Sequence, residues 1–235
     1  MIFLQTIIFG DCREVLKLLR AESFHLIVTS PPYNLGIEYP SWNDNLPDDD
    51  YFAFCQQWLS ECFRVLVEGG RLCLNIPLFV HHNRKNMLFE YLSILRETGF
   101  KEREMIVWAK KRRSDNDFVC KKKLFGSVAS PSNPHLRSVC EMILVMNKGS
   151  WRLSGNGSDI TIEEYSEWTK NVWEFDTESD RRHPAPFPYE LPKRLIKLYS
   201  YRGNRVLDPF VGRGTTLKVA KQLGRHGVGI ELSKE

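Results

Sequence analysis

Short apolar runs that alternate with helical patterns constrain the fold of this 235-residue chain more than any other feature. Six runs are short and aliphatic enough to be buried strands, at residues 24–28, 71–76, 105–109, 142–146, 205–207 and 227–230. The apolar opening residues 1–9 are also predicted to form a strand. Helical spacing predicts helices at residues 50–66, 87–95 and 188–199, ending near Gly69-Gly70, Gly99 and Gly203. This alternation predicts an α/β fold, a mostly parallel sheet with helices on both faces.

Two polar stretches interrupt the alternation. Residues 110–134 are basic, and residues 148–183 are rich in Gly, Ser, Asp and Glu. Long loops of this kind usually carry function, so both are predicted to lie over the functional edge of the sheet. The first is expected to be a basic loop and the second a target-recognition insertion. The length fits a single domain spanning residues 1–235.

Composition excludes several classes of protein. No apolar run approaches the roughly 20 residues that span a bilayer, and residues 1–9 lack the basic leader of a signal peptide. The six cysteines are scattered without a C-x-x-C pair, and the histidines show no metal-ligand spacing. We therefore predict no metal site and no membrane contact, and a cytoplasmic protein with reduced thiols.

Positive charge gathers in one segment. The chain carries a net charge of only +4, yet residues 101–125 contain nine basic side chains against four acidic ones. Such a run is either a solvated loop or a surface that binds a polyanion. The candidates for contacts with nucleic acid are Lys110, Lys111, Arg112, Arg113, Lys121, Lys122 and Lys123.

A turn with two closely spaced glycines follows the apolar run at residues 205–207. The turn begins with Asp208 and contains Gly212 and Gly214, where the backbone can approach a ligand without a Cβ in the way. Thr215-Thr216 then opens a helix, whose free N–H groups favour an anion such as a carboxylate.

The next strand, at residues 227–230, delivers a second acid. Glu231 stands at its tip, where an acid typically bonds ribose hydroxyls. The glycines follow neither G-x-G-x-x-G nor the P-loop pattern. The order of strand, acid, G-x-G, helix, strand and acid suits an adenosyl ligand that bears a carboxylate and an ammonium group. Asp208 would then bind the ammonium group.

The strand at residues 24–28 runs directly into Thr29-Ser30-Pro31-Pro32-Tyr33. Two prolines fix two φ angles and remove two N–H donors, so strand pairing must stop there. Most strings of this kind are simple proline turns. The alternative is a rigid pair of acceptors, the Ser30 hydroxyl and the Pro31 carbonyl, that holds a polar group of a substrate.

Taken together, T-S-P-P-Y and D-P-F-x-G-x-G-T-T resemble the amino-group DNA methyltransferases, which act on cytosine N4 or adenine N6. The order, with S-P-P-Y first and G-x-G last, is similar to the permuted β group of that family. Further matching pieces run along almost the whole chain: Gly10-Asp11-Cys12, Arg64-Val65-Leu66-x-x-Gly69-Gly70, Ile106-Val107-Trp108-x-Lys110, Ser132-Asn133-Pro134 and His183-Pro184-Ala185-x-Phe187-Pro188. The resemblance implies a Rossmann-like S-adenosylmethionine-dependent methyltransferase fold and double-stranded DNA as the substrate.

The resemblance also assigns residues. It implies an S-adenosylmethionine site made of Asp11, Phe187, Pro188, Asp208, Phe210, Gly212, Gly214, Thr215, Thr216 and Glu231. It implies a catalytic element made of Ser30, Pro31, Pro32 and Tyr33. Two acceptors on the exocyclic amine would pull its nitrogen toward sp³ geometry and aim the lone pair at the methyl group. Tyr33 would stack on the flipped-out base.

Several alternatives remain open. Serine before Pro-Pro-Tyr favours cytosine N4 by resemblance, and adenine N6 is the alternative. Methyltransferases of RNA or of protein glutamine could also use Pro-Pro-Tyr, but they usually place the G-x-G element first. A C5-cytosine enzyme needs a cysteine nucleophile, typically after proline, and none of the twelve prolines precedes cysteine.

A different class of protein is a non-catalytic nucleic-acid-binding partner of the same fold. Such a partner would be expected to have lost Ser30, Tyr33 or the glycine turn, which this chain keeps. A cognate restriction endonuclease as partner stays open, as does the choice between monomer and homodimer.

Overall fold

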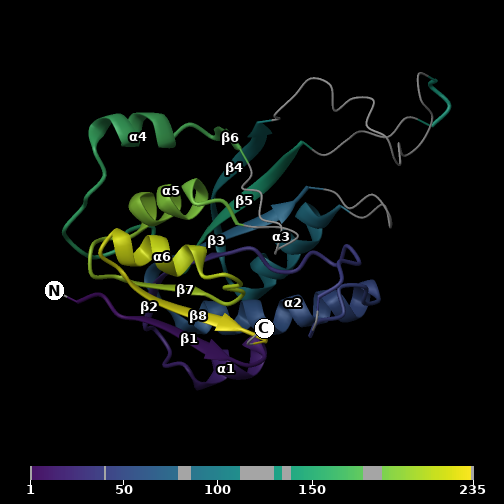
Figure 1. Ribbon diagram of the computed structural model, residues 1–235, viewed down its shortest axis with the longest axis horizontal. Helices are drawn as coiled ribbons and strands as arrows, with labels where there is room; N and C mark the ends of the chain where they lie inside the picture. Colours follow the sequence, from purple (N-terminus) through teal and green to yellow (C-terminus); the bar gives the residue numbers. More distant parts are fainter. Residues whose placement is uncertain are drawn as a thin grey trace.

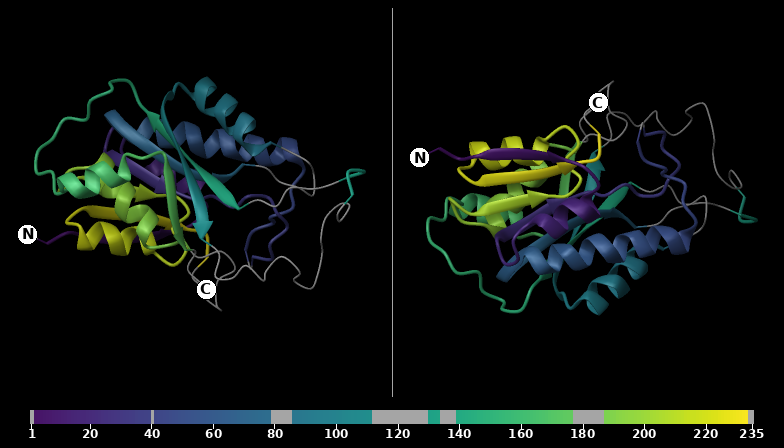
Figure 2. Two further views of the ribbon diagram at one scale, coloured as in Figure 1. Left: turned by 90° about the horizontal axis from the view of Figure 1, so that it is seen from above. Right: turned by 90° about the horizontal axis from the view of Figure 1, so that it is seen from below.

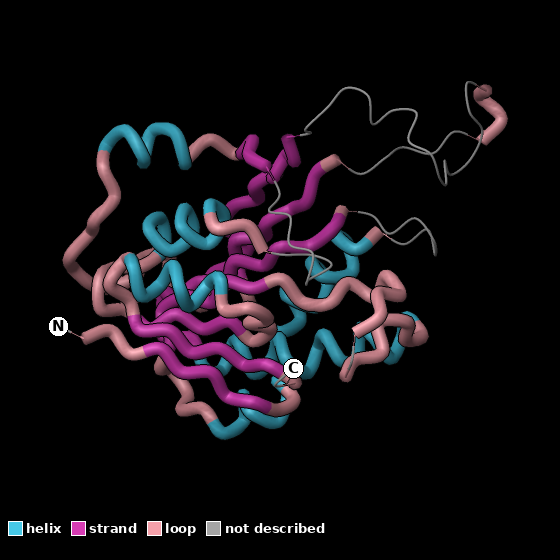
Figure 3. The backbone as a smooth tube through the Cα atoms, in the orientation of Figure 1, coloured by secondary structure: helices cyan, strands magenta, loops and turns pink. Residues whose placement is uncertain are grey.

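Eight strands form one sheet at the centre of the computed structural model, which describes residues 2–39, 41–78, 86–111, 130–133, 139–176 and 187–233. The strand order is β1-β8-β7-β2-β3-β5-β4-β6 (Figures 1 and 3). The bounds are β1 (Gln5–Phe9), β2 (Phe24–Thr29), β3 (Leu66–Pro77), β4 (Lys101–Lys111), β5 (Cys140–Asn147), β6 (Val172–Asp176), β7 (Arg205–Asp208) and β8 (His226–Glu231). Neighbouring strands pair in parallel except that β5 runs antiparallel to β3 and β4. The predicted, mostly parallel sheet is confirmed.

Helices cover both faces of the sheet, as predicted (Figure 2). One face packs against α1 (Cys12–Leu18), α2 (Asp48–Val65) and α3 (Met87–Thr98). The other packs against α4 (Ile162–Trp168), α5 (Glu190–Tyr199) and α6 (Thr215–Gln222). Within the described ranges, no helix has the length and apolar character needed to cross a membrane.

The end of α2 differs from the prediction. The helix predicted at residues 50–66 spans Asp48–Val65, but Gly69-Gly70, which were expected to end it, belong to β3. Gly69 has a φ of +74°, and a Cβ there would lie 2.2 Å from the carbonyl oxygen of Arg152. This glycine therefore permits a close approach of the loop after β5 instead of ending a helix. In contrast, α3 ends as predicted at Gly99, which has a left-handed φ of +102°.

The segment at residues 148–183 was expected to be a loop over the functional edge, and its described part is different. It contains α4 and β6, and Trp168 and Trp173 are buried in the core. The loop after β5 lies at the opposite edge, because the Gly69 N–H donates to the Lys148 carbonyl near the start of β3. The placement predicted for this loop is wrong, because β5 runs antiparallel. Residues 177–183 lie outside the described residues.

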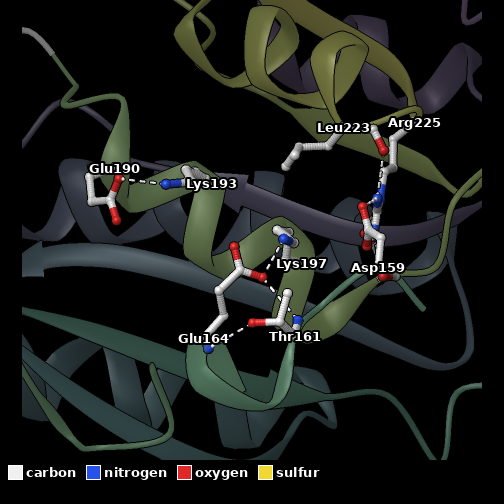
Figure 4. Close-up of polar contacts among 9 residues, drawn as sticks. Asp159, Thr161, Glu164, Glu190, Lys193, Lys197, Leu223 and Arg225 are labelled. Atoms are coloured by element: carbon white, nitrogen blue, oxygen red, sulfur yellow. Dashed lines mark hydrogen bonds and ion pairs between the residues drawn. The ribbon is translucent and has the colours of Figure 1, made fainter. Parts of the chain in front are cut away.

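Polar contacts fasten this segment to the helices on the same face (Figure 4). The Arg225 guanidinium is fully buried and donates two hydrogen bonds to Asp159, of 2.6 and 2.8 Å. Thr161 and Glu164 form a capping box at the start of α4, and Glu164 also pairs with Lys197 of α5. The helix α4 is thus part of the packed structure beside α5.

Candidate active site

Two segments that are far apart in the sequence meet where β2 and β7 end side by side. From β2 the chain continues through α2 to β3, and from β7 through α6 to β8, on opposite sides of this pair. Such a switch point is where open α/β sheets bind ligands, outside the carboxyl ends of the strands. A cavity of about 970 Å³ lies at this position.

The cavity brings together nearly all the described candidate residues. Those that line it are Asp11, Ser30, Pro31, Pro32, Tyr33, Lys110, Phe187, Pro188, Asp208, Phe210, Gly212, Thr215, Thr216 and Glu231. Gly214 is absent from the lining, and its φ of +79° at the start of α6 explains the glycine there. The backbone of Lys111 ends β4, while Arg112, Arg113, Lys121, Lys122 and Lys123 lie outside the described residues.

Asp208 is the most deeply buried acid of the cavity, with 3% of its surface exposed. It accepts hydrogen bonds from the hydroxyls of Thr29 at 2.7 Å and Thr216 at 2.6 Å, and from the Phe210 N–H at 3.1 Å. Burial raises the pKa of Asp208 to about 6, against the lowering effect of these three donors. The carboxylate therefore connects β2, β7 and α6 through hydrogen bonds at the bottom of the cavity.

Glu231, at the end of β8, contacts the glycine turn that follows β7. Its carboxylate accepts the Gly212 N–H at 2.8 Å, and Gly212 has a left-handed φ of +48°. Asp11 lies on the same side, at the end of β1, where it caps α1. Hydrogen bonds from Arg13 hold the pKa of Asp11 below its ordinary value. Two carboxylates thus border this end of the cavity.

At the other end of the cavity, Ser30 and Tyr33 belong to a hydrogen-bonded network. The Ser30 Oγ and the Tyr33 hydroxyl are 2.6 Å apart. The Asn75 Nδ2 donates to the Tyr33 hydroxyl at 2.8 Å and to the Glu141 Oε2 at 2.5 Å. Glu141 also forms an ion pair with Lys110. Burial raises the pKa of Tyr33 well above its ordinary value, so the hydroxyl stays neutral. Tyr33 also lines the cavity.

Asn75, Glu141 and Trp108 also line the cavity, and the sequence reasoning missed all three. Asn75 and Trp108 lie near the carboxyl ends of predicted strands, which is a signal that could have identified them. Glu141 gave no such signal, because it stands at the beginning of β5. Only the antiparallel direction of β5 brings it to this edge of the sheet.

Buried polar groups hold the proline segment and the loop that follows it. The Tyr51 hydroxyl donates to the Pro32 carbonyl at 2.8 Å and lies 2.7 Å from the Tyr91 hydroxyl. Asp44 is 2% exposed. Its carboxylate accepts backbone N–H groups from Asn34, Leu35 and Ile37. These contacts fix the shape of the chain beside Ser30 before any ligand binds.

The comparisons with known proteins agree with this geometry. The sequence profile of the N6/N4 methyltransferase family, described as DNA methylase, matches residues 24–235. The type II methyltransferase M.MjaI of Methanocaldococcus jannaschii is 32% identical, over 97% of this chain and 87% of the relative. The DNA adenine methyltransferase YhdJ of Escherichia coli is 30% identical, over 98% of this chain and 79% of the relative.

Solved structures give the same result. TTHA0409 of Thermus thermophilus, solved in complex with S-adenosyl-L-methionine, has a TM-score of 0.76 and 28% identity, covering 98% of this chain and 89% of the other. The cytosine-N4-specific PvuII DNA methyltransferase has a TM-score of 0.74 at 22% identity, covering 100% of this chain and 84% of the other, and supports the fold alone. From the cavity, the sheet and the sequence match together, the chain belongs to the family of N6/N4 amino DNA methyltransferases.

Proposed function

We propose that this S-adenosyl-L-methionine-dependent DNA methyltransferase transfers a methyl group to the N4 amine of a flipped-out cytosine in double-stranded DNA. One observation carries the proposal: a rigid acceptor pair, Ser30 and Pro31, and a glycine turn at Gly212 border the same cavity. A methyl donor held at the turn and an amine held at the acceptors would therefore share one space.

The residues present fit the methyl donor. Glu231 would accept hydrogen bonds from the ribose hydroxyls, Asp11 would lie near the adenine, and Phe187 and Phe210 offer apolar walls. The start of α6 offers N–H groups to the carboxylate of the methionine part. Asp208 would supply negative charge for the ammonium group of the cofactor, although three donors already occupy much of this carboxylate. When bound, S-adenosyl-L-methionine supplies an electrophilic methyl group on a sulfonium.

The chemistry requires a better nucleophile than a free exocyclic amine, whose lone pair is delocalised into the ring. The Ser30 hydroxyl and the Pro31 carbonyl accept its two N–H bonds and turn the lone pair out of the ring plane. The neighbouring prolines restrict the backbone, and the bond from Tyr51 to the Pro32 carbonyl holds the segment in place. Tyr33 offers a ring for stacking, with its hydroxyl already bound.

Adenine N6 is the second candidate, because one relative is named a DNA adenine methyltransferase and its 30% identity is close to the 32% of M.MjaI, whose name gives no base. Serine at position 30 supports cytosine by family resemblance. For DNA, we propose that the basic segment at residues 110–123 contacts phosphates.

The deciding experiment incubates unmethylated genomic DNA with the protein and labelled cofactor, digests it to nucleosides and identifies the product by mass. N4-methylcytosine supports the proposal, and N6-methyladenine selects the second candidate. Ser30→Ala and Tyr33→Ala should lose most methyl transfer while keeping cofactor binding, because both residues belong to the end of the cavity that would hold the nucleobase. A Tyr33→Ala variant that turns over at nearly the wild-type rate would contradict the assignment.

A further inference from the structure

The hydrogen bonds between Ser30, Tyr33, Asn75 and Glu141 run in one direction, because these groups differ in whether they can donate or accept. Glu141 forms an ion pair with Lys110, and a carboxylate can only accept hydrogen bonds. The Asn75 amide nitrogen, which can only donate, lies between Glu141 and Tyr33 and binds both. The Tyr33 oxygen therefore accepts from the Asn75 amide. Its own proton faces two acceptors, the Asn75 backbone carbonyl at 3.2 Å and the Glu141 Oε2 at 3.3 Å, and the charged carboxylate is the stronger of the two.

This direction decides what Ser30 presents to the substrate. With the Tyr33 proton directed to Glu141, the Ser30 proton points to the Tyr33 oxygen, 2.6 Å away. The lone pairs of the Ser30 Oγ then face the cavity and can accept from an amine. In the reverse direction, Ser30 would present its own proton to the amine hydrogens, and the contact would be repulsive.

We propose that Glu141 is the positioning residue of methyl transfer: through Tyr33 it makes Ser30 an acceptor and receives the proton that the amine loses. The inference rests on the proposed amino-methylation. A serine hydroxyl can pass on a proton but cannot keep a second one, so a site built on serine needs a carboxylate elsewhere to accept it. Glu141, whose side chain is only 13% exposed, is that carboxylate.

The step balances in atoms and electrons. The amine lone pair forms the new N–C bond while the S–C bond breaks and its electron pair stays on sulfur. The nitrogen then carries one surplus proton. The Ser30 Oγ takes this proton as it gives its own to Tyr33, and Tyr33 gives its proton to Glu141, which becomes neutral and later releases the proton to water.

Lys110 is the main competing explanation, because Glu141 could serve only to hold that lysine. Lys110 on β4 and Tyr33 after β2 are the titratable groups that contact Glu141 in the described part of the chain. From β3, the neutral Asn75 and Pro77 lie beside it, and Cys140 precedes it on β5. Removing the lysine and removing the carboxylate therefore test different parts of the network.

The test measures the single-turnover rate from pH 5 to 9 with saturating cofactor and DNA, for wild type, Glu141→Gln, Tyr33→Phe and Lys110→Met. We expect Glu141→Gln and Tyr33→Phe to lose about 100-fold or more, the range of acid–base catalysis. Both should bind cofactor and DNA as the wild type does, and Tyr33→Phe keeps the ring for stacking. Lys110→Met removes the cation and keeps the carboxylate, so at saturating DNA it should lose clearly less of the rate than Glu141→Gln, although Lys110 is also a candidate for phosphate contacts.

A rate within about threefold of wild type in either Glu141→Gln or Tyr33→Phe would overturn the inference. An equal loss in Lys110→Met would assign the role to the lysine instead. Should Glu141→Gln fail to fold, Tyr33→Phe still decides. Wild-type transfer to cytosine or to adenine serves equally as the reference rate, so failure of the cytosine assignment is distinguishable from failure of this inference.

Discussion

Replacing Asp208 by asparagine should stabilise the folded protein near pH 8 while it weakens cofactor binding. The carboxylate is buried at the base of the cavity, and burial raises its pKa from an ordinary value of 3.8 to about 6. A shift of this size corresponds to a cost of about 3 kcal/mol for holding the charged form in the folded state, at about 1.36 kcal/mol per pKa unit. An uncharged amide of nearly the same shape avoids that cost.

The expected gain in the free energy of unfolding is about 1–3 kcal/mol at pH 8. It can be smaller than the full cost of the charge, because the amide has an NH₂ group in place of one acceptor oxygen and the hydroxyls of Thr29 and Thr216 must reorient. The sign follows from linkage. A group whose pKa is raised on folding contributes stability below its unfolded pKa and loses it as pH rises through the folded pKa. The advantage of Asp208→Asn should therefore be complete above about pH 6 and shrink progressively toward pH 4.

Urea or thermal unfolding across pH 4–8 measures this effect, with about 2–4 °C expected per kcal/mol for a chain of this length. Asp159→Asn is the matched control, because Asp159 neutralises the fully buried Arg225. Its loss leaves a buried cation without its partner and should cost about 3–5 kcal/mol. Destabilisation of Asp208→Asn at every pH, or equal effects of the two substitutions, would refute the reasoning.

Three further predictions concern the segments around the cavity. Tyr51→Phe removes the bond to the Pro32 carbonyl and should cost about 1 kcal/mol in urea unfolding, with slower methyl transfer but unchanged cofactor affinity. Gly212→Leu strains a left-handed backbone position and fills the cavity, so calorimetry should detect no cofactor binding, and normal affinity would place the pocket elsewhere. Neutralising the three lysines at 121–123 should flatten the salt dependence of DNA binding by about two to three log units per decade. It should not change the methylated base, and an unaltered slope would assign those lysines to a solvated loop.

Local patterns in the sequence were sufficient for most of the elements, but not for α1, α4 and β6, and they were sufficient for the two ends of the cavity. The apolar run at residues 24–28 and the turn after residue 207 each carry their chemistry in consecutive residues, so Ser30 and Gly212 could be identified without any knowledge of packing. The family resemblance implied that these two motifs act together, which agrees with parallel strands ending at the same edge of a sheet. The cavity contains both.

Strand direction and non-local contacts could not be predicted in the same way. A buried run of aliphatic residues looks alike whether its strand runs parallel or antiparallel. The loop after β5 was therefore assigned to the wrong edge, and Gly69 was interpreted as the end of a helix instead of a point of close approach.

The sequence by itself determined the α/β alternation, the rigid Ser30-Pro31 acceptors and the glycine turn, because each depends on the backbone preferences of adjacent residues. Only the tertiary structure decided that Glu141 faces Tyr33, 108 positions away in the chain. It also decided that Asp208 joins three elements through buried hydrogen bonds. Hydrogen bonds and ion pairs between distant segments depend on how the strands are ordered and directed, and the antiparallel β5 set that order here.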